Sequence, residues 1–85
     1  MKTKDKAVDL IAEKNGKKIA FEIETGKNSL EQLIENLSKC LLAGYERVYL
    51  VPTSPKAYKR LYNLLEYDFG YGLGRIKMIH LWLKT

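Results

Sequence analysis

An Asn-Gly dipeptide between two apolar runs most constrains how this chain can fold. Asn15 and Gly16 follow the run 7–13 and precede the run 18–24. A type I′ turn requires positive φ at both central residues, and Asn-Gly meets that requirement better than any other common pair. The sequence therefore predicts a tight β-hairpin near the N-terminus.

The register of this hairpin predicts a cluster of carboxylates. With a two-residue loop, counting back along both strands places Asp9 opposite Glu22, and Glu24 projects from the same face two residues later. Directly opposed Cβ atoms lie roughly 5 Å apart, where like charges oppose folding. The usual resolutions are a bound divalent cation with oxygen ligands or a raised carboxylate pKa. We therefore expect these three carboxylates to form one site.

The spacing of apolar residues after the hairpin predicts two helices and two further strands. The first helix begins after Ser29, which fits a capping box with Gln32, and ends at Gly44. The later elements are a strand at 47–51, a helix opening at Ser54-Pro55, and a final strand at 75–84. A strand-helix-strand step favours a right-handed crossover with parallel strands. We expect an α/β fold with a small mixed sheet and its two helices packed against it.

Length, charge and cysteine content limit the class of protein. The 85 residues predict a single domain. The formal net charge of +5 favours a polyanionic partner, although many small basic domains bind nothing charged. One cysteine, Cys40, excludes an internal disulfide and favours a reducing cytoplasm. No apolar run approaches the roughly 20 residues of a membrane span, so we expect no membrane partner.

The hairpin and the first helix resemble the restriction-endonuclease-like PD-(D/E)XK nucleases. That superfamily has an Asp at the start of one strand, an acidic-x-Lys triplet on the antiparallel neighbour, and often a Gln in the following helix. Here Val8-Asp9-Leu10-Ile11 resembles the Asp element, Glu22-Ile23-Glu24 resembles the triplet, and Gln32 resembles the helix glutamine. The stretch 22–27 is similar to archaeal and prokaryotic branches near the Holliday-junction resolvases. The resemblance covers residues 7 to 52.

The resemblance implies a metal-dependent DNA endonuclease, with structured or branched DNA as a reasonable substrate. It implies Mg²⁺ or Mn²⁺ as cofactor, with Asp9 and Glu22 as direct ligands. Glu24 stands where the superfamily usually has Lys, and it could act as a base or contribute to a second metal. Lys27, just beyond the strand, could bring its ammonium group into the site. Gln32 completes the implied catalytic set.

A second departure from the superfamily pattern lies at the N-terminus. The superfamily usually has a helix and another strand before the Asp, whereas only residues 1–6 precede the hairpin here. We therefore expect a minimal version of the fold, a domain excised from a larger protein, or a chain completed by dimerisation. An exposed edge in so small a sheet favours a homodimer.

Basic residues in three regions are candidates for contacts with nucleic-acid phosphates, which would make binding depend on salt. A normal solubilising surface explains them equally well. They are Lys14, Lys17 and Lys18 at the hairpin tip, Lys56, Lys59 and Arg60 on the second helix, and Arg75 at the start of the last strand.

Two other functions remain open from the sequence. One is a non-catalytic module of the same fold, which binds nucleic acid or dimerises within a larger ATPase or mobile-element protein. The other is a purely structural α/β domain. The structural reading predicts that replacing Asp9 or Glu22 relieves repulsion and stabilises the fold.

Overall fold

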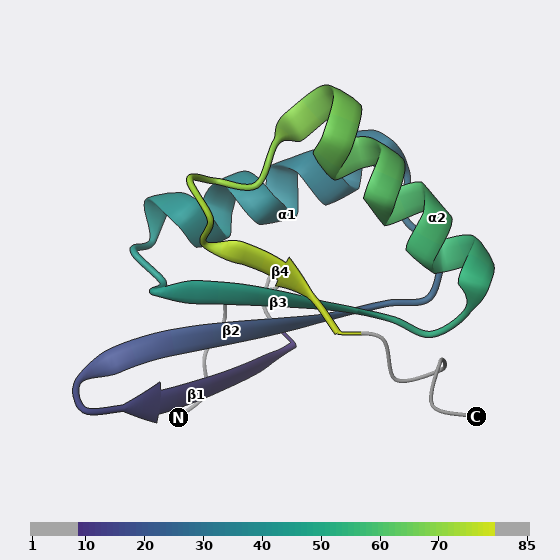
Figure 1. Ribbon diagram of the computed structural model, residues 1–85. Coiled ribbons are helices and arrows are strands. Elements are labelled where there is room, and N and C mark those ends of the chain that lie inside the picture. The colour runs from purple at the N-terminus through teal and green to yellow at the C-terminus, as the bar shows by residue number, and fades with distance from the viewer. Residues whose placement is uncertain (1–8, 80–85) are drawn as a thin grey trace.

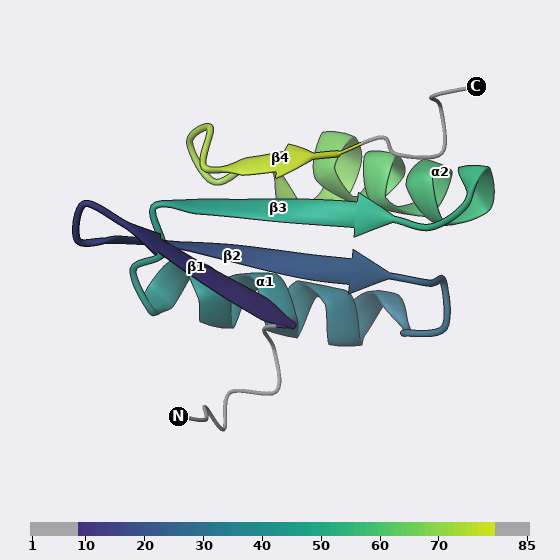
Figure 2. The same cartoon turned by 90° about the horizontal axis from the view of Figure 1, so that it is seen from below.

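The computed structural model describes residues 9–79, which form a four-stranded mixed sheet with both helices on one face (Figures 1 and 2). The sheet order is β1-β2-β3-β4; β1 is antiparallel to β2, and β3 runs parallel to both β2 and β4. The elements are β1 (Leu10–Lys14), β2 (Lys17–Glu24), α1 (Leu30–Leu42), β3 (Arg47–Pro52), α2 (Pro55–Asn63), a π-helical segment (Leu64–Phe69) and β4 (Ile76–Met78). The predicted mixed sheet with two helices is confirmed.

The hairpin turn and its register are as the sequence predicts. Asn15 and Gly16 both have positive φ, at 53° and 79°. The strand pairing runs from Lys14 opposite Lys17 to Leu10 opposite Phe21. Continuing this register by one residue brings Asp9, just before β1, level with Glu22 in β2.

Side-chain caps begin both helices at the predicted residues. Ser29 Oγ accepts a hydrogen bond from Gln32 N at 3.1 Å, and Ser54 Oγ accepts one from Ala57 N at 3.1 Å. These bonds satisfy backbone donors that have no partner within the helix. After α1 the chain turns at Gly44, where φ is 85°. The helix then leads into β3, which lies parallel to β2 as expected.

The hydrophobic core lies between the two helices and the face of the sheet that they cover. Its buried residues include Ala20, Val48 and Leu50 of the sheet, Leu33, Leu37 and Cys40 of α1, and Leu61 of α2, with Leu64 and Leu65 beyond it. On the other face, the rings of Phe21 and Tyr49 stack with centroids 5.3 Å apart, and Ile23 is 44% exposed. No helix among residues 9–79 covers that second face (Figure 2).

The described part of the last predicted strand, residues 75–79, contains β4. β4 has three residues, and Ile79 N continues its contact with β3 by donating to Leu50 O at 2.9 Å. The rest of the predicted strand, 80–84, lies outside the described residues, as do 1–8 at the start of the chain. Within the described part, every helix is too short or too polar to cross a membrane.

Candidate functional site

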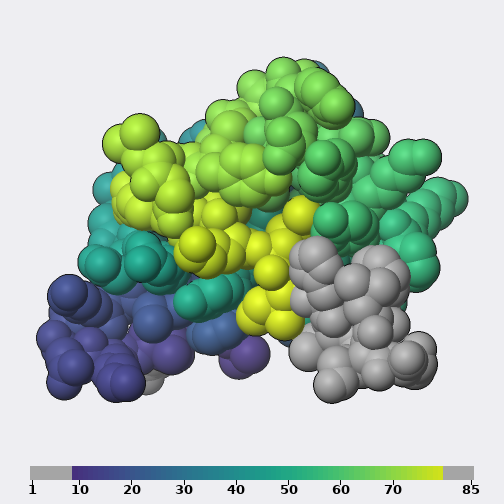
Figure 3. All heavy atoms as spheres, in the orientation of Figure 1, coloured from purple at the N-terminus to yellow at the C-terminus, as the bar shows by residue number. Residues whose placement is uncertain are grey.

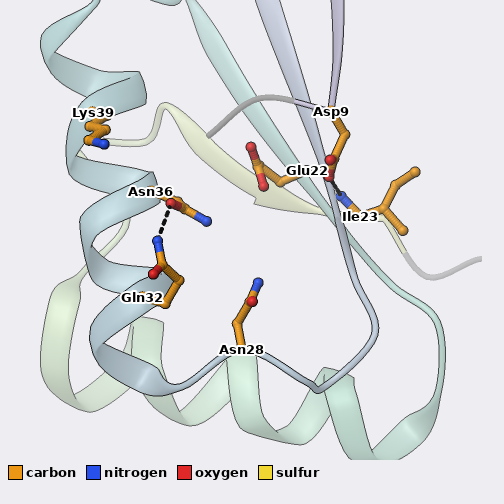
Figure 4. Close-up of a pocket in the computed structure, with 7 residues that line it drawn as sticks. All are labelled: Asp9, Glu22, Ile23, Asn28, Gln32, Asn36 and Lys39. Carbon is orange, nitrogen blue, oxygen red and sulfur yellow. Dashed lines mark hydrogen bonds between the residues drawn. The ribbon is translucent and has the colours of Figure 1, made fainter. Parts of the chain in front are cut away.

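A cavity of about 360 Å³ lies beside the C-terminal part of β2, between that strand and α1 (Figure 4). The start of β1, the end of β2, the β2–α1 loop and one side of α1 contribute to its wall. Its lining residues are Asp9, Glu22, Ile23, Asn28, Gln32, Asn36 and Lys39. We call it the acidic cavity because two of the carboxylates predicted from the sequence meet in it.

The hairpin brings Asp9 and Glu22 to this cavity from neighbouring strands. Asp9 Oδ2 accepts a hydrogen bond from Ile23 N at 2.8 Å, which fixes the carboxylate beside β2. Glu22 lies on the helix-facing side of the sheet; it is half-buried, and its Oε2 atom is fully buried. Figure 4 shows the Glu22 carboxylate between Asp9 and α1. The structure therefore brings together the two residues predicted to bind metal directly.

Gln32 also lines the acidic cavity, as the resemblance implies. Its backbone N–H takes part in the Ser29 cap, whereas its side-chain Nε2 donates to Asn36 Oδ1 at 3.0 Å. The side chain is thus directed along the helix, toward the next turn. This bond orients both amide groups on the side of α1 that faces the two carboxylates (Figure 4).

Glu24 lies elsewhere, although it shares a sheet face with Glu22. It is only 3% exposed, and its Oε2 accepts from Gly26 N at 2.8 Å and lies 3.8 Å from Arg60 Nη1. The chain turns at Gly26, so the carboxylate folds back onto this turn instead of reaching the acidic cavity. Between residues 9 and 79 no group of three or more His, Cys, Asp or Glu side chains could hold a metal ion. The predicted cluster of three carboxylates is therefore reduced to the Asp9–Glu22 pair.

Lys27 lines a second cavity, of about 330 Å³, on the other side of the β2–α1 loop. We call it the basic cavity, because Lys27, Lys56 and Arg60 all line it. Its remaining wall is formed by Thr25, Gly26, Ser54 and Ala57. The structure therefore places Lys27 with two of the predicted phosphate-binding residues and not with the carboxylates that it was predicted to assist.

The other predicted phosphate contacts lie apart from both cavities. Arg75 donates from Nε to Tyr45 O at 3.1 Å and from Nη2 to Leu41 O at 3.1 Å, so its guanidinium group joins the end of α1 and the α1–β3 loop to the residue before β4. Lys59 is exposed on α2 but does not line the basic cavity. We conclude that Arg75 has a structural role.

The hairpin-tip lysines, Lys14, Lys17 and Lys18, are exposed at the opposite end of the sheet from the first turn of α2 (Figures 1 and 3). Lys17 begins β2 and Glu22 comes five residues later, which at the usual strand rise corresponds to about 16 Å. These lysines therefore belong to a surface separate from the acidic cavity.

Asn28, Asn36 and Lys39 line the acidic cavity but were not predicted from the sequence. With Gln32, the last two recur at i, i+4 and i+7 along α1, a polar stripe beside the apolar one. That spacing shows from the sequence that Asn36 and Lys39 share one face of α1 with Gln32, but it does not show that this face meets the carboxylates. Lys39 Nζ lies 3.4 Å from Glu35 Oε2 on the helix surface, and both side chains are more than half exposed.

The donors around the acidic cavity fit a hard divalent cation. Carboxylate oxygens from Asp9 and Glu22, the side-chain amide oxygens of Asn28 and Asn36, and water together match the all-oxygen coordination that Mg²⁺ prefers. Mg²⁺ commonly keeps several waters, so two carboxylates are sufficient protein ligands. Among the described residues, Asp9 and Glu22 are the carboxylates that line this cavity, and Glu24 does not line it.

Comparison of the chain with protein-family models, curated proteins and solved structures found no match. The restriction-endonuclease-like core therefore stays a prediction from the sequence, and the geometry of the acidic cavity carries the functional argument.

Proposed function

We propose that this protein is a metal-dependent nuclease that hydrolyses phosphodiester bonds in DNA, with its active site in the acidic cavity. The observation that carries the proposal is the position of Asp9 and Glu22. They come from two paired strands and line one cavity with three side-chain amides and a lysine. Placing two like charges together in a fold this small is unfavourable unless a cation compensates them.

Asp9 and Glu22 would hold the divalent ion in this cavity. Such an ion, when bound, polarises a phosphate and lowers the pKa of water. The hydrogen bond from Ile23 N keeps the Asp9 carboxylate in place. The sheet and α1 partly bury Glu22, which limits its hydration and strengthens its attraction for a cation.

The amide and ammonium groups of α1 would contact the substrate. Gln32 and Asn36 orient each other through their hydrogen bond, and their remaining donors suit a phosphate oxygen or a water. Lys39, on the same side of α1, would offset negative charge that develops on the phosphate. In this proposal Lys39 takes the role that Lys has in the superfamily triplet, where this chain has Glu24.

The test is a cleavage assay with labelled double-stranded, single-stranded and four-way-junction DNA, run with Mg²⁺, Mn²⁺ or EDTA. Glu22→Gln and Asp9→Asn remove the proposed metal ligands and keep the shape of the side chains. Glu13→Gln is the matched control, because Glu13 is an exposed carboxylate on β1 that does not line the cavity. We expect cleavage only in the presence of metal. Glu22→Gln and Asp9→Asn should each cleave at least about 100-fold more slowly, because each removes a charge that binds the metal. Glu13→Gln should cleave at the wild-type rate.

A nucleic-acid-binding module without catalysis is the second candidate, and the basic cavity favours it because its cations do not depend on a metal. It predicts that the protein binds DNA without cleaving it and that Glu22→Gln leaves this binding unchanged.

A purely structural domain is the remaining alternative. It predicts no DNA binding, no effect of Mg²⁺ on stability, and a Glu22→Gln variant that is more stable than the wild type. Sedimentation of the wild type would test the predicted homodimer in the same preparation.

A further inference from the structure

We propose that the basic cavity binds a backbone phosphate of the same nucleic-acid strand whose scissile phosphate lies in the acidic cavity. This inference rests on the proposed function and adds the path of the substrate across the protein. The two cavities lie on opposite sides of one short segment, the β2–α1 loop. Ile23 and Asn28 line the acidic cavity, and Thr25 to Lys27 line the basic one.

The charge of the basic cavity suits a phosphate. Lys27 comes from the β2–α1 loop, and Lys56 and Arg60 come from α2, so cationic residues of two separate elements line one space. No Asp or Glu is among the described lining residues, and the buried carboxylate of Glu24 contacts two of them, Gly26 N and Arg60. Three cations against one carboxylate leave an excess of positive charge at the cavity.

The donors of Arg60 and α2 add geometry to this charge. Arg60 Nη1 donates to Gly26 O at 3.3 Å and faces Glu24, and both contacts use that one nitrogen of a group with five N–H donors. The cavity also lies against the first turn of α2, where Ser54 caps the helix and the helix dipole is positive. The Arg60 contacts join α2 to the loop that lies between the two cavities.

A polynucleotide fits this arrangement better than a free anion. A strand that crosses the β2–α1 loop would place one phosphate on each side of it, one near the carboxylates with their metal and one near the cations. Contacts of this kind fix the register of a strand and carry no base specificity. We therefore expect binding that is independent of sequence and that weakens as salt rises.

The test measures binding separately from cleavage, in EDTA, with a fluorescent single-stranded oligonucleotide across a series of NaCl concentrations. The test variant is the double substitution Lys27→Gln and Lys56→Gln. Lys59→Gln is the matched control, because Lys59 is exposed on the same helix but lies outside the cavity. Arg60 is left intact since it also contacts buried Glu24.

We expect the double variant to bind about tenfold more weakly at low salt, and its plot of log K against log salt to be flatter by about 0.7 to 1. Lys59→Gln should keep the wild-type slope. Equal slopes for the wild type and the double variant would overturn the proposal. The proposal would also be overturned if inorganic phosphate raised the melting temperature of the wild type while the oligonucleotide did not bind to it.

Replacing one phosphate at a time with a neutral methylphosphonate tests the position of the site. In the wild type a neutral linkage should suppress the Mg²⁺-dependent cut that lies a constant number of nucleotides from it, because binding without sequence preference takes every register and only the cut marks one of them. The double variant should be insensitive to that linkage, and equal sensitivity in both proteins would contradict the proposal. If the wild type cuts nothing, the nuclease is rejected while the binding measurements in EDTA still decide whether the cavity holds a phosphate.

Discussion

The carboxylate of Asp9 accepts a hydrogen bond from the backbone N–H of Ile23, with 2.8 Å between Oδ2 and the nitrogen. Leu10 and Phe21 are the last strand pair, and this bond links the residue before Leu10 to the second residue after Phe21. A carboxylate has two oxygens, so Oδ2 can hold the group in place while Oδ1 coordinates the proposed metal ion. Asp9 therefore combines a structural contact with its proposed metal-binding role.

The two roles of Asp9 can be separated by two substitutions. Asp9→Ala removes the acceptor, and we expect it to lower the free energy of unfolding by about 1 kcal/mol in EDTA. Asp9→Asn retains an oxygen acceptor and should cost less than about 0.5 kcal/mol, yet it should abolish stabilisation by Mg²⁺. Urea unfolding with and without Mg²⁺ measures both effects. Equal stability of the two variants in EDTA would show that the bond to Ile23 contributes nothing.

Arg60 is predicted to stabilise the fold through buried Glu24. The Arg60→Ala substitution leaves that carboxylate, 3% exposed, with less compensation. Because the Arg60 side chain is itself 29% exposed, water screens part of the loss, and we expect a decrease of about 1–2 kcal/mol in the free energy of unfolding. Lys59→Ala should change it by less than about 0.5 kcal/mol. Similar values for both variants would contradict a stabilising role.

The hairpin shows why half of the candidate site could be predicted from the sequence. The positive φ values that Asn15 and Gly16 adopt are a local property of those residues, and once the loop length is known the strand register follows by counting. Asp9 and Glu22 could therefore be paired without knowledge of the rest of the fold. The caps at Ser29 and Ser54 are local signals of the same kind.

The positions of Glu24 and Lys39 could not be predicted from local sequence signals. Strand alternation correctly places Glu24 on the helix-facing side, but its contacts come from Gly26 and from Arg60, which lies on an element far along the sequence. Lys39 reaches the acidic cavity because α1 packs beside β2, an orientation that the apolar stripe alone does not specify. Predicting either position requires the packing of helices on the sheet.

Lys39 is predicted to act in the reaction and to have little effect on stability. The exposed ion pair between Lys39 and Glu35 is worth less than about 1 kcal/mol. Lys39→Met should therefore leave unfolding nearly unchanged and should lower the cleavage rate at least tenfold while Mg²⁺ still binds. Glu35→Gln breaks the same ion pair and is the matched control. If both variants cleave at the same rate, the ammonium group has no role in the reaction.

Tyr71 is predicted to make the stability of the protein depend on pH in alkaline solution. Burial, followed by its 2.8 Å hydrogen bond to Glu66 Oε2, raises the pKa of Tyr71 from 10.0 to about 12. Between these values the unfolded chain loses the phenolic proton and the folded protein keeps it. The stabilisation is therefore complete below pH 10 and is lost as the pH rises toward 12.

The Tyr71→Phe variant tests this directly, because it removes the titrating group and retains the ring. We expect its free energy of unfolding to be lower than that of the wild type below pH 10, and the difference to shrink as the pH rises toward 12. Tyr67→Phe, which removes the hydroxyl of an exposed tyrosine from the π-helical segment that carries Glu66, is the control. Urea unfolding at a series of pH values gives the curves. A constant difference between the wild type and Tyr71→Phe would show that the hydrogen bond to Glu66 does not couple folding to that proton.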